Sequence, residues 1–404
     1  MTRKNICIND SLVLDENSIW YISPEYQMLV EVNRVNGNIR NLWDLPKRYS
    51  HRHLVKNENH LYIFPYIGSR DVLDFDLDTK IFKVIPIQNE ILSESENECR
   101  LYGSVRYRDS IFAFGEKPFI FQFDIKSKKF TIHRSVIEAL GNCKFPYYFW
   151  RSGYVENNLL IIPLYSSPMV LIFDMNSGRC KIKDLDVKNS SYGFNCIDFD
   201  GEDYWLSVVG NGYRVVRWNK ENDIIKTIDV KNVDTSADDI PFYGVFCSDG
   251  FTWLLPAKSD MAFKINHNDE SIEECLGIPA VNVSHLTNDW KHNYMNCTKI
   301  NSYKFLSINL ELQKIVEVDT HNNKVNVMSI KIPNALHRVI HNIEIAQMRR
   351  MLKKMENLEE YYYNIKNYLD IINDFKWNQE VLKKASKIKM VGKNIYQHID
   401  KVYF

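Results

Sequence analysis

A short pattern of two apolar segments around a turn recurs seven times along this sequence. The second segment ends on Asp or Asn, as in IWYISPEYQMLVEVN and TWLLPAKSDMAFKIN. We call this last residue the anchor, and it falls at Asn33, Asp76, Asp124, Asp174, Asn219, Asn266 and Asp319. Successive anchors lie 43 to 53 residues apart. A repeat of about that length, built from short strands, is typical of β-propeller blades.

Each copy of the repeat predicts a sheet of four strands. In the sixth copy the segments FYGVFCSD, FTWLLPA, MAFKIN and SIEECLGI predict the innermost, second, third and outermost strands. The anchor is predicted to open the turn between the third and fourth strands through a side-chain to backbone hydrogen bond. One sheet cannot bury both of its faces, so neighbouring sheets must stack and the ring must close. The aromatic and apolar positions predicted to pack between blades include Trp20, Phe64, Phe112, Trp205, Trp253 and Phe305.

The predicted fold is therefore an all-β, seven-bladed β-propeller over residues 1–333, with no helix before the ring is complete. Beyond it the apolar period changes, since Ile345, Met348, Leu352 and Met355 follow one another at steps of three and four. This spacing predicts a C-terminal helical tail over 334–404. The tail would pack within the chain or form a coiled-coil homodimer, and we favour the first alternative.

Composition excludes several classes of partner. The chain of 404 residues carries 51 basic and 51 acidic side chains. Binding to nucleic acid or to an anionic membrane needs a surplus of Lys and Arg, so neither partner is expected. The N-terminal segment MTRKNICINDSLVLDEN has no apolar core of a signal peptide, and the eight cysteines contain no CxxC pair. We therefore expect a cytoplasmic protein with reduced thiols.

Motifs that carry chemistry are absent from the sequence. It contains no HExxH, GxSxG or GxxxxGK[ST] motif and no dinucleotide-binding fingerprint. The histidines are dispersed, so no metal site and no cofactor are expected. Cys196 and Cys247 fall on predicted innermost strands, with Cys297 near the same register. We interpret them as small buried apolar residues rather than nucleophiles.

The candidate ligand-binding residues come from the predicted geometry of a propeller. Loops that lead into the innermost strands, and loops between second and third strands, open on one face around the axis, where ligands usually bind. The aromatic, basic and histidine side chains of these loops are His51, His53, Tyr66, Arg70, Tyr102, Arg106, Trp150, Arg151, Tyr165, Tyr192, Tyr243, Lys258, His292 and Tyr294.

Two stretches carry a resemblance to a known group of proteins. YWLSVVGNGYRVVRWNKENDIIK and TWLLPAKSDMAFKIN are similar to bacterial seven-bladed propellers of the WD40/YVTN/kelch-like superfamily, of an uncharacterised type found in Firmicutes. The resemblance covers roughly residues 5–333. The kelch double glycine and the WD40 Gly-His and Trp-Asp pairs are missing, so no functional residue is carried over.

Two functions remain open from the sequence. The first is a non-catalytic recognition or scaffold protein that binds a peptide, glycan or protein partner on one propeller face. The second is a propeller enzyme, a lyase or hydrolase, acting on a glycan or small molecule at the mouth of the central channel. There His51, His53, Arg151 and His292 would converge, since acid–base catalysis needs such groups within hydrogen-bond reach of one substrate.

Overall fold

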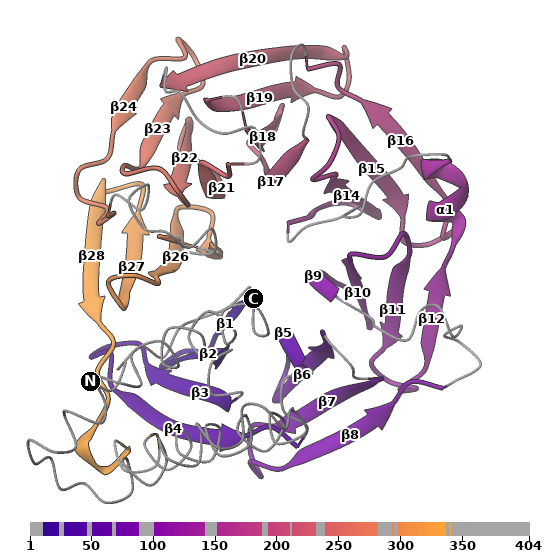
Figure 1. The fold of residues 1–404 in the computed structure, drawn as a ribbon, viewed down its shortest axis with the longest axis vertical. Coiled ribbons are helices and arrows are strands. Elements are labelled where there is room, and N and C mark those ends of the chain that lie inside the picture. The colour runs from indigo at the N-terminus through magenta and orange to yellow at the C-terminus, as the bar shows by residue number, and fades with distance from the viewer. Residues whose placement is uncertain are drawn as a thin grey trace, which may run out of the picture. The chain divides into compact units, whose positions relative to one another are not determined.

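Seven antiparallel sheets of four strands make up the fold, and we call them blades 1 to 7 in chain order. The computed structural model describes residues 11–23, 28–46, 51–66, 70–88, 101–141, 152–187, 193–210, 212–231, 239–281, 293–294, 297–336 and 340. In every blade four consecutive strands pair in sequence order. Figure 1 shows the first strand of each blade nearest the centre and the fourth at the rim, which confirms the predicted propeller.

The strands are as follows. Blades 1 to 4 consist of β1 (Leu12–Leu14), β2 (Ser18–Ser23), β3 (Met28–Asn33) and β4 (Ile39–Asp44); β5 (His51–Asn57), β6 (His60–Pro65), β7 (Asp71–Asp76) and β8 (Phe82–Pro86); β9 (Leu101–Tyr107), β10 (Ser110–Gly115), β11 (Ile120–Asp124) and β12 (Phe130–His133); β13 (Tyr154–Glu156), β14 (Leu159–Pro163), β15 (Met169–Asp174) and β16 (Cys180–Asp184). Blades 5 to 7 consist of β17 (Phe194–Phe199), β18 (Tyr204–Val208), β19 (Tyr213–Asn219) and β20 (Ile224–Lys231); β21 (Phe242–Ser248), β22 (Phe251–Pro256), β23 (Phe263–Asn266) and β24 (Ile272–Glu274); β25 (Thr298–Asn301), β26 (Lys304–Asn309), β27 (Lys314–Asp319) and β28 (Lys324–Ser329).

All seven predicted anchors end the third strand of their blade. Each accepts backbone N–H bonds in the turn to the fourth strand; Asp174 Oδ1, for example, accepts from the N–H groups of Asn176 at 2.9 Å and Ser177 at 3.2 Å. The fourth residue after each anchor has a positive φ, at Gly37, Lys80, Lys128, Gly178, Asp223, Glu270 and Asn323. The predicted role of the anchor in the turn is therefore confirmed, and the seven turns share one backbone shape.

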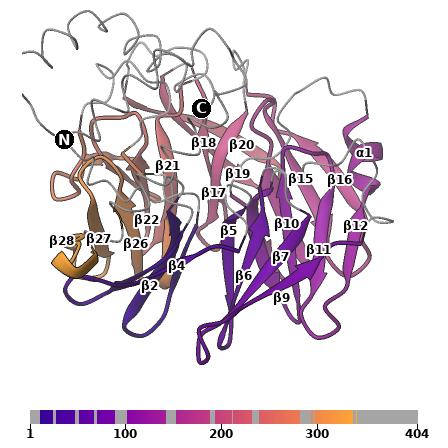
Figure 2. The same ribbon diagram turned by 60° about the horizontal axis from the view of Figure 1, so that its bottom comes forward.

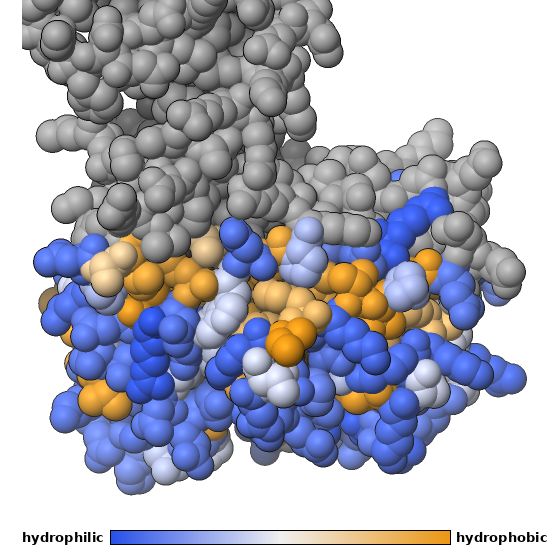
Figure 3. Space-filling model, turned by 90° about the horizontal axis from the view of Figure 1, so that it is seen from below, coloured by the Kyte–Doolittle hydropathy of each residue, from blue (hydrophilic) through white to orange (hydrophobic). Residues whose placement is uncertain are grey.

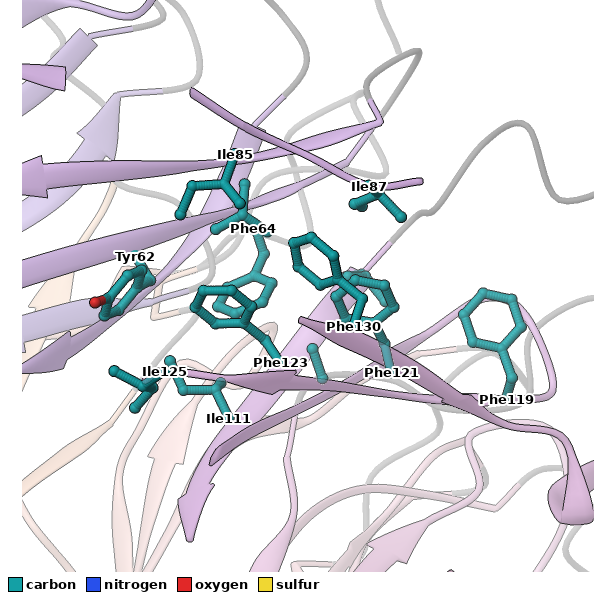
Figure 4. Close-up of a cluster of buried hydrophobic side chains, with 13 residues drawn as sticks. Tyr62, Phe64, Ile85, Ile87, Ile111, Phe119, Phe121, Phe123, Ile125 and Phe130 are labelled. Atoms are coloured by element: carbon teal, nitrogen blue, oxygen red, sulfur yellow. The ribbon is translucent and has the colours of Figure 1, made fainter. Parts of the chain in front are cut away.

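The core lies between neighbouring blades. Figure 4 shows the cluster between blades 2 and 3, where Tyr62 and Phe64 of β6 meet Phe121 and Phe123 of β11. Phe64 lies with its ring centroid 6.5 Å from that of Phe121 and 6.3 Å from that of Phe123, both edge to face. The equivalent clusters of other blade pairs contain Trp20, Phe112, Trp205, Trp253 and Phe305. Full burial of one such ring stabilises the fold by about 1.5–3 kcal/mol.

One helix within the propeller corrects the expectation that helices follow only after the ring. Helix α1 (Ser135–Leu140) stands between blades 3 and 4. Its Val136 and Leu140 are buried in the core cluster of those blades, and Gly141, at φ 56°, ends it. Six residues are too short for a periodic apolar pattern to be recognised in the sequence.

The two ends of the propeller differ in their connections. We call the end that carries the connections between blades the loop end, and the end with the tight innermost-to-second-strand turns the turn end. Figure 2 shows the blades side by side around the ring.

On the side drawn in Figure 3, hydrophilic residues predominate in the lower part, and apolar residues lie in separate groups. Among the described residues, no helix is both long and apolar enough to cross a membrane.

The backbone contacts divide the chain into two units, Arg3–Ile332 and a second formed by Met1–Thr2 with Pro333–Phe404. Nearly all of the predicted helical tail lies outside the described residues. The tail, its coiled coil and the domain boundary at residue 333 therefore stay predictions.

Candidate functional site

A cluster of tyrosines gathers at the loop end of the propeller. Tyr102 of β9 and Tyr243 of β21 are buried there, together with Val209, Ile240 and Ala257. Tyr66, which follows β6, and Tyr165, which follows β14, pack against them and are only partly buried. The ring centroids of Tyr66 and Tyr102 are 5.6 Å apart, edge to face. Four of the predicted candidate residues, from blades 2, 3, 4 and 6, thus come together in what we call the tyrosine cluster.

A β-bulge repeated at one register places two of these tyrosines. The innermost strands of blades 2, 3, 5 and 6 each carry one residue that is skipped in the pairing with the second strand: Arg52, Tyr102, Asn195 and Tyr243. Bulges bend a strand and re-aim a side chain, and they are frequent beside binding sites. A Cβ added to Gly244 would lie 2.9 Å from Leu255 Cβ. The glycine after Tyr243 is therefore needed for the close approach of β21 and β22.

The remaining candidates of the loop end hold polar contacts. Lys258 Nζ binds Asp239 Oδ1 at 2.7 Å. His51 is buried, and its Nε2 lies 3.0 Å from Asp71 Oδ1 and 2.9 Å from the Asp71 carbonyl. His53 is also buried, on the same strand. Arg70 precedes β7, and its carbonyl accepts a hydrogen bond from Ile87 N–H at 2.8 Å.

Two candidates lie away from the tyrosine cluster. Arg106 pairs with Ile111 near the turn end of blade 3, at the opposite end of β9 from Tyr102. Tyr294 is fully buried and donates its hydroxyl to the Pro279 carbonyl at 2.6 Å; this burial raises its pKa. Four further candidates lie outside the described residues: Trp150, Arg151, Tyr192 and His292. The predicted convergence of His51, His53, Arg151 and His292 therefore stays a prediction.

An ion pair that the sequence did not suggest joins three blades near the axis. Lys299 Nζ of β25 lies 2.5 Å from Asp198 Oδ1 of β17, and the other oxygen, Oδ2, accepts from Cys247 N–H of β21 at 2.7 Å. Burial raises the pKa of Asp198. The ammonium of Lys299 also lies 5.2 Å from the ring centroid of Phe246 and 5.7 Å from that of Tyr154. The two partners are 101 residues apart in sequence, so no local motif marks them.

Of the cysteines near this ion pair, Cys196 and Cys247 are buried and Cys297 is partly buried. Burial raises the pKa of the Cys247 and Cys297 thiols, and Cys196 Sγ donates to the Tyr243 carbonyl at 2.8 Å. A thiol must ionise to act as a nucleophile. These environments support the interpretation of all three as packing residues.

Within the described ranges, no group of three His, Cys, Asp or Glu side chains is placed to hold a metal ion.

A hydrogen-bonded chain between blades 5 and 6 has the order of a catalytic triad. Thr252 Oγ1 lies 2.9 Å from His267 Nε2, and His267 Nδ1 lies 3.3 Å from Asp200 Oδ2. However, Thr252 is fully buried, and Trp205 stacks on His267 with ring centroids 5.0 Å apart while donating to Asp200 at 2.7 Å. Burial lowers the pKa of His267. No substrate reaches this hydroxyl, so the chain serves to join the two blades.

Comparison with known proteins supports the fold alone. No family model matches the sequence, and no curated protein matches it. The structure is similar to that of the computationally designed Ika8 protein, with 9% sequence identity, a TM-score of 0.50, and coverage of 80% of this chain and 88% of that one. BamB from Moraxella catarrhalis is 14% identical, with a TM-score of 0.47 and coverage of 80% and 83%. The assignment to the WD40/YVTN/kelch-like superfamily and the Firmicutes source stay predictions.

Proposed function

We propose that the protein is a non-catalytic recognition protein that binds a peptide, glycan or protein partner at the loop end, over the tyrosine cluster. The observation that supports this most directly is the convergence of Tyr66, Tyr102 and Tyr165 with Tyr243 from four blades. Tyrosine offers a large rigid face and a polar tip at a low cost in conformational entropy, which suits it to contact surfaces.

The partly buried tyrosines are the ones placed to meet a partner. Tyr102 and Tyr243 are each only 4% exposed, so they support the surface from beneath. Tyr66 and Tyr165 pack against them and retain exposed area. A partner would therefore contact Tyr66 and Tyr165 while the two bulged tyrosines hold them in position. Assembly through the helices expected beyond residue 334 belongs to the same proposal.

The test is selection of ligands from a peptide display library and from a glycan array, using the full chain. Ligands selected on the unaltered protein should bind Tyr66→Ser and Tyr165→Ser about tenfold more weakly, which corresponds to about 1.4 kcal/mol. Tyr303→Ser is the matched control, because Tyr303 is 41% exposed and lies in the turn between β25 and β26 at the turn end. If all three variants bind the selected ligands equally well, the tyrosine cluster is not the binding surface.

A further inference from the structure

Asn36 and Gly37 form an Asn-Gly dipeptide in the turn between β3 and β4, where blade 1 meets blade 7. The sequence holds one other Asn-Gly pair, at 211–212, and its asparagine lies outside the described residues. The Gly37 carbonyl accepts from Lys331 N–H at 2.8 Å, and a Cβ on Gly37 would lie 2.2 Å from the Ser329 carbonyl oxygen. Closure of the ring therefore requires glycine directly after this asparagine.

An asparagine followed by glycine has a reaction of its own that needs no enzyme. The glycine nitrogen attacks the side-chain amide carbon of the asparagine; a C–N bond forms, and the amide nitrogen leaves as ammonia with the glycine N–H proton. The product is a cyclic succinimide, and water opens it at either carbonyl to give aspartate or isoaspartate. Isoaspartate runs the main chain through its Cβ and so lengthens the backbone by one carbon. Glycine favours the attack because it has no side chain to hinder it.

The turn brings the two reacting groups together and also protects them. Asn36 is exposed, and its Oδ1 accepts from Asn38 N–H at 3.0 Å. This Asx turn folds the side-chain carbonyl over the Gly37 peptide. Gly37, however, is buried, and its N–H donates to the Asn33 carbonyl at 2.9 Å. The nitrogen must release this proton before it attacks, so the reaction requires the turn to open.

We propose that Asn36 is a site of spontaneous deamidation through a succinimide, that the closed ring suppresses the reaction, and that isoaspartate at this position weakens reclosure. Gly37 and Ile39, which follow, hold both backbone hydrogen bonds to Lys331, and an extra backbone carbon before Gly37 displaces them. A protected group reacts in proportion to the population of the locally open state. The extent of conversion thus reports how often blades 1 and 7 separate, and it does not depend on the recognition function.

Asn222 in blade 5 provides a matched comparison within the same molecule. Like Asn36, it is the third residue after its anchor, and its Oδ1 accepts from Ile224 N–H at 3.2 Å. The residue that follows is Asp223, at φ 58°. The two turns therefore share one shape, but the side chain of Asp223 hinders attack by its nitrogen. Asn222 should convert much more slowly than Asn36.

The first measurement is incubation of the full chain at mildly alkaline pH, folded or unfolded in urea. Peptide mapping by mass spectrometry, with chromatography that separates isoaspartate from aspartate, follows each asparagine. Isoaspartate should accumulate at Asn36 in urea, about tenfold or more slowly in the folded protein, and far less at Asn222. No isoaspartate at Asn36 in urea, equal rates in folded and unfolded protein, or equal conversion of Asn36 and Asn222 would each overturn the proposal.

The second measurement tests whether the seam controls the reaction. Arg34→Met removes the ion pair with Glu317 that spans blades 1 and 7. It should speed conversion of Asn36 in the folded protein about threefold, which corresponds to about 0.7 kcal/mol. Lys126→Met is the control, because it removes an ion pair with Asp109 within blade 3, and it should leave the rate unchanged. Equal rates in the two variants would show that the seam does not control the reaction.

The third measurement tests the consequence of conversion. Protein that carries isoaspartate at position 36 should exchange the amide hydrogens of Ile39 and Lys331 faster than fresh protein. Asn36→Ser keeps an oxygen acceptor for the turn but cannot form a succinimide, so the same incubation should leave its exchange unchanged. If converted protein exchanges at these amides as slowly as fresh protein, the ring closes over isoaspartate and that part of the proposal is wrong.

Discussion

Asp198 is a carboxylate with almost no solvent contact, and groups from two other blades hold its oxygens. Only 4% of its side chain is exposed, whereas 44% of the side chain of Lys299 is. Breaking a buried pair is costly mainly because it strands the partner that remains buried. Removal of Lys299 should therefore lower stability because it leaves the buried charge of Asp198 without a partner. Because Lys299 is itself partly exposed, the loss should be smaller than for a fully buried pair.

Lys299→Met should lower the free energy of unfolding by about 2 kcal/mol at pH 7. The control is Lys304→Met, which removes an ion pair whose carboxylate, Asp319, is 15% exposed against 4% for Asp198, and it should cost less stability. Burial already raises the pKa of Asp198, and loss of Lys299 raises it further. An acid with a raised pKa favours folding at low pH and loses that contribution as the pH rises through its folded pKa. The deficit of Lys299→Met should thus shrink on acidification, as urea unfolding at pH 7 and pH 5 would measure; a deficit independent of pH would contradict this account.

At the scale of the element, the repeated turn after the third strand is the part of the fold that the sequence predicts most directly. Four of the anchors are Asp and three are Asn, and both supply the same acceptor to the turn. Hydrogen bonds from the Asn322 side chain and backbone, together with Lys304, lower the pKa of Asp319 to about 2. The pKa values of Asp76, Asp124 and Asp174 are lowered by similar bonds.

Asp319→Asn should preserve the turn while removing its acid sensitivity. Because the folded pKa of Asp319 is depressed, its contribution to stability is complete above the ordinary value of 3.8 and is lost as the pH falls towards about 2. The stability advantage of the unaltered protein over Asp319→Asn should therefore shrink between pH 4 and pH 2, measured by urea unfolding. The reverse substitution at an equivalent anchor, Asn33→Asp, should make stability more sensitive to acid over the same range. Parallel pH profiles for all three proteins would show that the anchors do not titrate as described.

Other elements were not predictable from local patterns. The bulges at Tyr102 and Tyr243 depend on how each innermost strand pairs with the second strand of its blade, and no local pattern predicted them. The approach of Tyr66 and Tyr165 to them could be expected once the ring was recognised, because all four lie at the loop end. By contrast, the pairing of Lys299 with Asp198 depends on which side chains meet between blades. The repeat predicts that blades stack, but it does not specify these contacts.

At the scale of the molecule, the described strands of the first and last blades show no exchange where the ring closes. Every blade consists of four consecutive strands. Blades 1 and 7 are joined instead by two backbone hydrogen bonds, from Ile39 N–H to the Lys331 carbonyl at 2.9 Å and from Lys331 N–H to the Gly37 carbonyl at 2.8 Å. The ion pair of Arg34 with Glu317, at 3.0 Å, spans the same seam. Closure therefore depends on the close approach of the backbone at Gly37 to the end of blade 7.

Gly37→Ala should weaken this closure more than backbone strain alone explains. Gly37 has φ +73°, and a Cβ there would lie 2.2 Å from the Ser329 carbonyl oxygen. Gly250 has a similar φ of +77° with nothing within 4 Å of an added Cβ, so Gly250→Ala isolates the cost of the left-handed conformation, about 1 kcal/mol. Gly37→Ala adds a clash with backbone and should cost about 3 kcal/mol in urea unfolding. Hydrogen exchange at the Ile39 and Lys331 amides should accelerate in Gly37→Ala and not in Gly250→Ala. Equal stability losses in the two variants, with unchanged exchange at the seam, would mean that the ring is held closed by other contacts.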